Sequence, residues 1–288
     1  MIEELGQKVP IDFLCKHFGA SRSGYYKWKN QRDVHRLTEK EIICRVIKKI
    51  FKDSKETYGS PRVWVELKSK NFKISENTVA KYMKELGLDA RHRKSFKVQT
   101  TDSGHEDPIA PRVFKTEEAS THPKGPGEVL AGDITYLRLG TKNFLYLAVV
   151  LDLFSREVVG WSMGNTLETS LVLTALENAM DKVGPDVEVT FHSDRGSQYA
   201  SEAYRNFLKD NNMIPSMSRK GNCYDNAYVE SWFASLKKEW IYRRNYSSEK
   251  ELKALVFEYI ETWYNRKRKH SALDYMSPEE YKNNHRSA

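Results

Sequence analysis

FHSDRGSQYA (residues 191–200) and RKGNCYDNAYVESWFASLK (residues 219–237) are the first and second halves of the most informative part of this sequence. In the first half, Asp194 closely follows an apolar run at residues 187–191, which is typical of a buried strand. In the second half, Glu230 belongs to a helical pattern whose apolar positions are Val229, Trp232, Phe233, Leu236 and Trp240. One carboxylate therefore stands at a strand end and another on a helix, and separate elements of this kind can bring acidic side chains together.

A third acidic residue, Asp133, lies within the strand-like run VLAGDITYL at residues 129–137. Asp152 lies in the next strand-like run, and spacing alone does not choose between these two acids. Three converging carboxylates can hold two divalent metal ions roughly 3.5–4 Å apart, an arrangement that suits in-line displacement at phosphorus. The acidic residues therefore predict a metal-dependent phosphoryl-transfer site.

The chain has the pattern of an α/β fold from residue 129 onward. Strand-like runs at residues 129–139, 143–154 and 156–164 are separated by short turns, which predicts an antiparallel meander. A helix, a strand, a helix and a strand are then predicted over residues 167–183, 187–192, 202–211 and 213–217. The helix of Glu230 follows, and a last long helix starts at a capping box formed by Ser248 and Glu251. This order predicts a ribonuclease-H-like fold, with a mixed five-stranded sheet and flanking helices.

The N-terminal part of the chain is predicted to be helical. Residues 9–29 show a helix, a break at Gly19 and a second helix, which outlines a partial helix-turn-helix, although a simple helical hairpin fits as well. Residues 35–90 predict a three-helix unit, either a helix-turn-helix domain or a helical bundle for protein contact. In the first case its third helix would enter a major groove, and the candidate base and phosphate contacts there are Asn77, Thr78 and Lys81.

Composition and charge narrow the class of protein. The chain of 288 residues is 39% hydrophobic, which is enough for a sizeable core, and its net charge is +8. Residues 1–100 carry a charge of +11, whereas residues 101–288 carry −3. A basic part beside a slightly acidic part predicts DNA binding in one and metal use in the other, although a solvated basic surface gives the same charge.

Several other classes of protein are not expected. The sequence has no run of about 18 apolar residues and no signal-peptide pattern, so we expect a cytoplasmic, nucleoid-associated protein without a membrane span. Its cysteines form no Cys-x-x-Cys pair, which argues against a zinc finger. Residues 91–127 are polar and rich in breakers, which is typical of a linker. Charged residues at the start of this segment are candidate phosphate contacts, unless they are only solvated: Arg91, Arg93 and Lys94.

The chain resembles the integrase core of bacterial insertion-sequence transposases in five motifs: GDITYL, LYLAVVLDLFSREVVGWSM, HSDRGSQY, SMSRKGNCYDNAYVESWFASLKKEW and FEYIETWYNRKRKHSALDYMSPEEY. Within that group it is similar to the larger reading-frame product, OrfB, of the insertion-sequence-three family. The resemblance covers nearly the whole chain, since TYGSPRVWVELK in the helical part matches as well. We therefore expect a partial helix-turn-helix segment at 1–34, a helix-turn-helix domain at 35–95, a linker at 96–125 and an integrase catalytic core at 126–285.

The resemblance implies a catalytic triad of Asp, Asp and Glu, which falls on Asp133, Asp194 and Glu230 and so selects Asp133 over Asp152. These carboxylates would hold two Mg²⁺ or Mn²⁺ ions. The basic residue seven positions after the glutamate in the family corresponds to Lys237, which shares a helical face with Glu230 and would contact a phosphate. Polar residues of the adjacent loops are further candidate DNA contacts: Arg195, Ser197, Gln198, Asn222, Tyr224 and Asn226.

The activity that the resemblance implies is cleavage of DNA at transposon ends and joining of those ends to target DNA. The expected partners are double-stranded DNA, further copies of the chain in a dimer or larger assembly, and an upstream-frame product fused by frameshifting. Two other functions compete with this one, namely a catalytically inert DNA-binding regulator and a nuclease that acts on RNA–DNA hybrids. The presence of all three acids and Lys237 disfavours the first, and the basic N-terminal part disfavours the second.

Overall fold

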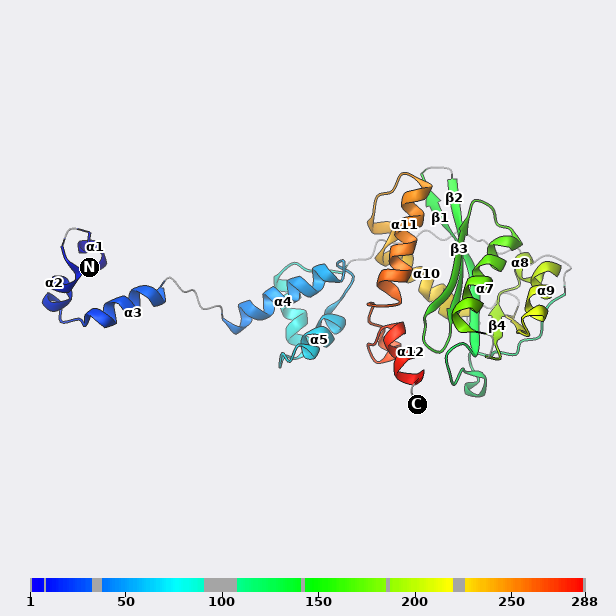
Figure 1. Cartoon of the computed structure of the whole chain (residues 1–288), viewed down its shortest axis with the longest axis horizontal. Helices are drawn as coiled ribbons and strands as arrows, with labels where there is room; N and C mark the ends of the chain where they lie inside the picture. Colours follow the sequence, from blue (N-terminus) through cyan, green and yellow to red (C-terminus); the bar gives the residue numbers. More distant parts are fainter. Residues whose placement is uncertain are drawn as a thin grey trace. The chain divides into compact units, whose positions relative to one another are not determined.

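The structure is a computed structural model that describes residues 2–7, 9–32, 38–90, 108–140, 143–184, 187–219 and 226–286 (Figure 1). The chain divides into two compact units, Met1–Asp89 and Ala90–Ala288, and each has buried apolar residues of its own. None of the helices in the described ranges combines the length and apolar character that a membrane crossing requires.

The described residues up to Arg32 form helices α1 (Ile2–Leu5), α2 (Ile11–His17) and α3 (Arg22–Arg32), of which only α2 and α3 were predicted. Gly19 lies between α2 and α3 with a φ of 64°, a conformation that glycine adopts without the steric cost of a side chain. Leu14 and Tyr25 are buried here, whereas Phe13 and Trp28 are exposed. This segment therefore buries only a small core.

Helices α4 (Glu39–Asp53), α5 (Ser60–Ser69) and α6 (Glu76–Glu85) pack together through buried apolar residues: Ile47, Val63, Leu67 and Val79. A capping box is present at the start of α4. Thr38 Oγ1 accepts the N–H of Glu41 at 3.3 Å, and Glu41 Oε2 accepts the N–H of Thr38 at 2.7 Å. The three helices predicted for residues 35–90 are therefore confirmed.

The Ala90–Ala288 unit is built on a five-stranded sheet, with strand order β3-β2-β1-β4-β5 in its described residues. The strands are β1 (Val129–Leu139), β2 (Asn143–Asp152), β3 (Val158–Gly164), β4 (Thr190–Ser193) and β5 (Ile214–Met217). β1, β2 and β3 form the predicted antiparallel meander, while β4 runs parallel to β1 and to β5. The predicted mixed sheet is therefore confirmed.

Helices cover both faces of this sheet (Figure 1). Helices α7 (Thr169–Val183), α8 (Ser197–Ala200) and α9 (Glu202–Asp210) pack on one face, against Leu130 and Phe191. On the other face lie α10 (Ala227–Glu239) and α11 (Glu249–Phe257), and α11 continues into a π-helical segment, Glu258–Tyr264, ahead of α12 (Pro278–Arg286). Because strand residues alternate between faces, Asp133 points to the side of α10.

Several element boundaries differ from the predicted ones by one to three residues, and two of them have a clear structural cause. Helix α7 begins at Thr169 rather than at residue 167. The carbonyl of Leu167 accepts a hydrogen bond from the Gln198 side chain of α8 instead of from a helical N–H. Strand β4 begins at Thr190 rather than at residue 187, because its partner β1 offers pairing only from Val129 onward. Both differences come from tertiary contacts that local sequence does not contain.

Residues 110–114, which we expected to be linker, run along β5 as an edge strap. The N–H groups of Val113 and Phe114 donate to Ser216 Oγ at 3.0 and 2.9 Å, and the N–H of Met217 donates to the carbonyl of Pro111 at 3.4 Å. Phe114 is only 2% exposed. The edge strap covers the outer edge of the sheet, where unpaired backbone groups would otherwise be presented, and a single apolar side chain anchors it.

Candidate active site

Asp133 and Asp194 stand at the same level of neighbouring parallel strands. Strands β1 and β4 pair Ala131 with His192, and continuing this register by two residues sets Asp133 opposite Asp194. Asp194 directly follows the last residue of β4, and its Oδ1 accepts the N–H of Gly196 at 2.9 Å. The parallel pairing of the two strands is therefore what brings the two carboxylates together.

Burial and neighbouring charge both act on Asp133. Burial raises the pKa of Asp133 well above its ordinary value, and the negative charge of Asp194 is the next largest cause of this rise. The N–H of Ile134, 2.7 Å from Oδ1, lowers that pKa, whereas the charge of Glu230 raises it and the charge of Lys237 lowers it. The acids thus share one electrostatic environment, in which a bound cation or a retained proton is favourable.

Helix α10 brings Glu230 and Lys237 to this environment. Glu230 lies in the first turn of α10 and is exposed. Lys237 lies two turns later and is partly buried, and its Nζ donates to Thr135 Oγ1 at 2.6 Å and lies 4.9 Å from the centroid of the Tyr136 ring. Burial lowers the pKa of Lys237, while the charge of Asp133 acts in the opposite direction. The lysine is therefore anchored to the strand that carries Asp133.

The candidate site is a pair of carboxylates with a third nearby. Within the described ranges, no group of three or more His, Cys, Asp or Glu side chains is arranged to hold a metal ion. The register of β1 and β4 places Asp133 near Asp194, and the charge of Glu230 raises the pKa of Asp133. The arrangement therefore offers cation-attracting oxygens on the strands, with Glu230 carried separately on α10.

The predicted DNA contacts that follow Asp194 are tied into the protein. Arg195 Nε donates to the carbonyl of Ser218 at 2.7 Å, and Gln198 Nε2 donates to the carbonyl of Leu167 at 3.2 Å. Ser197 begins α8 and is partly buried. These side chains hold the loop after β4 in place, and their contact with DNA stays a prediction.

The predicted contacts ahead of α10 have different outcomes. Asn226 is buried, and its Nδ2 donates at 3.3 Å to the carbonyl of Gly132, the residue before Asp133. Its side chain therefore fixes the start of α10 to β1. Asn222 and Tyr224 lie outside the described residues.

Asp152, the alternative third ligand, holds a turn. Its carboxylate accepts the N–H groups of Gly127, Phe154 and Ser155 at 3.2, 3.3 and 3.1 Å, and also the Ser155 hydroxyl. Burial raises the pKa of Asp152, and these hydrogen bonds oppose that rise. With its oxygens occupied by donors of the turn between β2 and β3, this carboxylate has a structural role.

His192 is a packed residue beneath the site. Its Nδ1 lies 2.9 Å from Ser216 Oγ and its Nε2 lies 3.1 Å from Ser218 Oγ. Because Ser216 Oγ already accepts two N–H groups of the edge strap, its own hydrogen is free for Nδ1. The contacts therefore fit a neutral imidazole that joins β4 to the segment after β5.

The candidate DNA contacts of the helical unit lie at the start of α6. Asn77 and Lys81 are exposed, whereas Thr78 is partly buried and its Oγ1 lies 2.9 Å from Ser75 Oγ, within the helix cap. The basic residues Arg91, Arg93 and Lys94 lie outside the described residues. Asn77 and Lys81 are therefore the side chains of this set that are placed to reach a partner.

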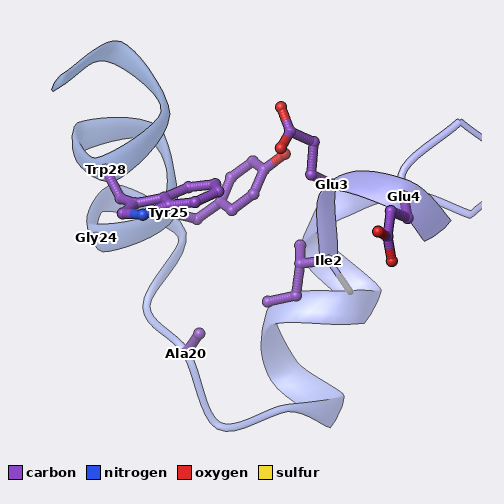
Figure 2. A pocket seen from close by; sticks show the side chains of 7 residues that line it. All are labelled: Ile2, Glu3, Glu4, Ala20, Gly24, Tyr25 and Trp28. Carbon is purple, nitrogen blue, oxygen red and sulfur yellow. The ribbon is translucent and has the colours of Figure 1, made fainter. Parts of the chain in front are cut away.

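A pocket of about 530 Å³ opens among the N-terminal helices, and Figure 2 shows the Glu3 side chain extending toward the Tyr25 ring. Its lining consists of Ile2, Glu3, Glu4, Ala20, Gly24, Tyr25 and Trp28. None of the predicted site residues lines it, so this pocket has no part in the candidate active site.

Two residues of the site were missed in the sequence. Thr135 binds Lys237, and its position two residues after Asp133, on the same strand face, is a signal that could have identified it. Tyr199 is 2% exposed, and burial, followed by the charges of Asp133 and Asp194, raises its pKa well above the ordinary value. No local pattern distinguishes Tyr199 from any other core tyrosine.

Known proteins are similar to this chain in sequence. Residues 123–223 and 211–278 match two family models described as integrase core domain, and residues 38–96 match one described as HTH-like domain. Transposase InsF for insertion sequence IS3A of Escherichia coli (strain K12) is 38% identical over 284 residues, which covers 98% of this chain and 97% of that protein. An uncharacterized 31 kDa protein of insertion element IS600 from Shigella sonnei is 36% identical over 265 residues, covering 92% of this chain and 96% of that protein.

Solved structures overlap the chain more loosely. The catalytic domain of Mos1 mariner transposase covers 56% of this chain and 76% of its own, with a TM-score of 0.43 and 16% identity. The catalytic core domain of HTLV-2 integrase, solved in complex with magnesium, covers 55% of this chain and 98% of its own, with a TM-score of 0.43 and 15% identity.

Proposed function

The chain belongs to the transposase family of insertion sequence IS3, and we propose that it cleaves and joins DNA strands at element ends with Asp133, Asp194 and Glu230. The observation that carries the proposal is the parallel register of β1 and β4, whose continuation sets Asp133 opposite Asp194, together with the charges of Asp194 and Glu230 that raise the pKa of Asp133. Carboxylates drawn from two strands and a helix are suited to metal-dependent transfer at phosphorus.

The donor set fits divalent cations. Hard cations such as Mg²⁺ and Mn²⁺ take carboxylate oxygens as ligands, and the negative charge that raises the pKa of Asp133 would be compensated by a cation. Asp133 and Asp194 would hold the two ions, with Glu230 as the third carboxylate. Such ions, when bound, activate an attacking oxygen and stabilise the leaving oxygen of a phosphodiester.

The protein's own groups orient the DNA and the acids. Lys237 holds a positive charge beside Asp133, and its hydrogen bond to Thr135 fixes the direction from which it would contact a phosphate. Arg195 orders the loop that follows Asp194. Asn226 holds the start of α10 to the strand of Asp133. Contacts from β1, from α10 and from the loop after β4 therefore keep the site in place.

The helical unit would bind the element end. Residues 38–96 match a family model described as HTH-like domain, and residues 1–100 carry a charge of +11. Asn77 and Lys81 are exposed at the start of α6. Two ends have to be paired for transposition, so we infer that at least two copies of the chain assemble on DNA. Fusion to an upstream-frame product stays a prediction.

A cleavage assay tests the proposal. The full chain is incubated with Mg²⁺ and a labelled duplex that carries an end of its element, and nicking is followed for the wild type, Asp194→Asn and Asp152→Asn. We expect nicking by the wild type and none by Asp194→Asn. Folded Asp152→Asn should retain nicking, because Asp152 serves the turn. Binding without nicking would favour a DNA-binding regulator, and cleavage restricted to an RNA–DNA hybrid would favour a hybrid-specific nuclease.

A further inference from the structure

Arg156 has a backbone conformation that its residue type disfavours. It lies in the turn between β2 and β3 with a φ of 62°, in the left-handed region that glycine and asparagine adopt more readily than residues with long side chains. Its N–H closes the turn by donating to the carbonyl of Asp152 at 2.8 Å. An asparagine would serve this turn with less strain, so the presence of arginine indicates a use for its side chain.

That side chain reaches the first turn of α10. Arg156 Cζ lies 3.8 Å from the centroid of the Tyr228 ring, a close cation–π contact, and Tyr228 precedes Glu230 by two residues. Among the described residues Arg156 has no ion-pair partner, and the nearby Asp152 is occupied by N–H groups of the turn. The contact of its guanidinium with Tyr228 therefore links the turn between β2 and β3 to α10.

Two buried polar atoms at this end of α10 have no hydrogen-bond partner within the described part of the chain. One is the donor Arg156 Nη1, and the other is the acceptor Asn226 Oδ1. Unpaired buried groups of this kind are unfavourable. The start of α10 therefore has hydrogen-bonding capacity that this arrangement leaves unused.

We propose that Arg156 is a positioning residue that sets the first turn of α10, and thereby Glu230, relative to Asp133 and Asp194. The inference rests on the proposed function, because it assigns Arg156 to the carboxylate site. Asn226 holds the same turn to β1, so the helix start is fixed from two directions. Because Glu230 is exposed, the position of this turn decides how closely its carboxylate approaches the other two.

Four variants separate positioning from simple stability. Arg156→Asn suits the positive φ but lacks the guanidinium, Tyr228→Leu removes the aromatic face, and Tyr228→Phe keeps it. Arg244→Ala is the matched control, since Arg244 Cζ lies 3.5 Å from the Trp240 ring beyond the other end of α10. All are made in the full chain and compared by melting temperature, nicking rate on saturating element-end duplex, and hydrogen exchange of residues 226–232.

Arg156→Asn and Tyr228→Leu should lose nicking rate by about tenfold or more, because a small displacement of a catalytic carboxylate slows the reaction. Both should exchange faster at residues 226–232, while Arg156→Asn keeps the wild-type melting temperature. Tyr228→Phe should behave as the wild type, and Arg244→Ala should leave exchange at residues 226–232 unchanged.

Wild-type nicking and wild-type exchange in Arg156→Asn and Tyr228→Leu would overturn the inference. It would also be overturned if the loss in Arg156→Asn merely followed a fallen melting temperature, because the role would then be general stability. Glu230→Gln separates this inference from the proposed function. If Glu230→Gln nicks as fast as the wild type, the proposed function fails, while hydrogen exchange in Arg156→Asn still decides whether Arg156 holds α10.

Discussion

Lys237 Nζ lies 2.6 Å from Thr135 Oγ1, and this hydrogen bond ties helix α10 to β1 two residues beyond Asp133. Asp133 and Thr135 point to the same face of the strand, and Glu230 lies on the same helix as Lys237. One contact therefore links the strand that supplies the first carboxylate to the helix that supplies the third.

Removing the charge of Lys237 should impair catalysis more than folding. Burial lowers the pKa of Lys237, so its charged form is less favourable in the folded protein than in the unfolded chain. We expect Lys237→Met to lose about tenfold or more in nicking rate if the ammonium contacts a phosphate, a charge-assisted bond worth about 1.5–3 kcal/mol. Its melting temperature should change little, because relief of the buried charge offsets the loss of the contacts with Thr135 and Tyr136, and Lys237→Arg should retain part of the activity. A wild-type nicking rate in Lys237→Met would contradict this assignment.

Asp133→Asn should stabilise the protein while abolishing activity. The pKa of Asp133 is well above its ordinary 3.8, so the folded state binds this proton more tightly than the unfolded state does. The stability from this group is complete below the unfolded pKa and is lost as the pH rises through the raised folded pKa. At pH 7 without metal, Asp133→Asn should therefore melt at a higher temperature than the wild type. The difference should shrink on acidification, and a lower melting temperature for the variant at pH 7 would refute the electrostatic argument.

The sequence predicted the site as far as local patterns extend. The strand that carries Asp133 and the buried face of α10 were predicted correctly, since Val229, Trp232 and Leu236 are all buried. The choice of Asp133 over Asp152 came from the family resemblance. The contacts of Lys237 with Thr135 depend instead on how α10 crosses β1. Tertiary packing sets that crossing, so spacing along the chain places Thr135 on the strand face of Asp133 but does not pair it with Lys237.

The edge strap shows the same limit. A polar, breaker-rich sequence favoured a linker, yet Phe114 and the hydroxyl of Ser216 hold the segment on β5. Ser216→Ala should leave two N–H groups without their acceptor and cost about 1–3 kcal/mol for each that stays buried. Hydrogen exchange at residues 110–118 should accelerate relative to helix α7, which serves as the internal reference. Unchanged exchange there would show that the strap is held by other contacts.

The basic run at residues 266–269, which follows the π-helical segment, contains one member of a buried ion pair. Arg268 is buried, and its guanidinium donates to both carboxylate oxygens of Glu239 at 2.7 and 2.6 Å. Arg268→Met should cost about 3–5 kcal/mol of unfolding free energy, because it leaves a buried carboxylate without this partner. Adding Glu239→Leu should recover much of that loss. Chemical denaturation of both variants measures it, and a double variant no more stable than Arg268→Met would contradict the pairing argument.

Strand joining is the best test of whether Asp133, Asp194 and Glu230 carry out metal-dependent DNA transfer. A labelled duplex ending in a free 3′-hydroxyl at the element end is incubated with a supercoiled plasmid, Mg²⁺ and the full chain. We expect transfer of label to the plasmid by the wild type, and loss of transfer with a chelator or in Asp133→Asn, Asp194→Asn and Glu230→Gln. Joining that survives in any of these folded carboxylate variants, or that proceeds without a divalent cation, would contradict this expectation.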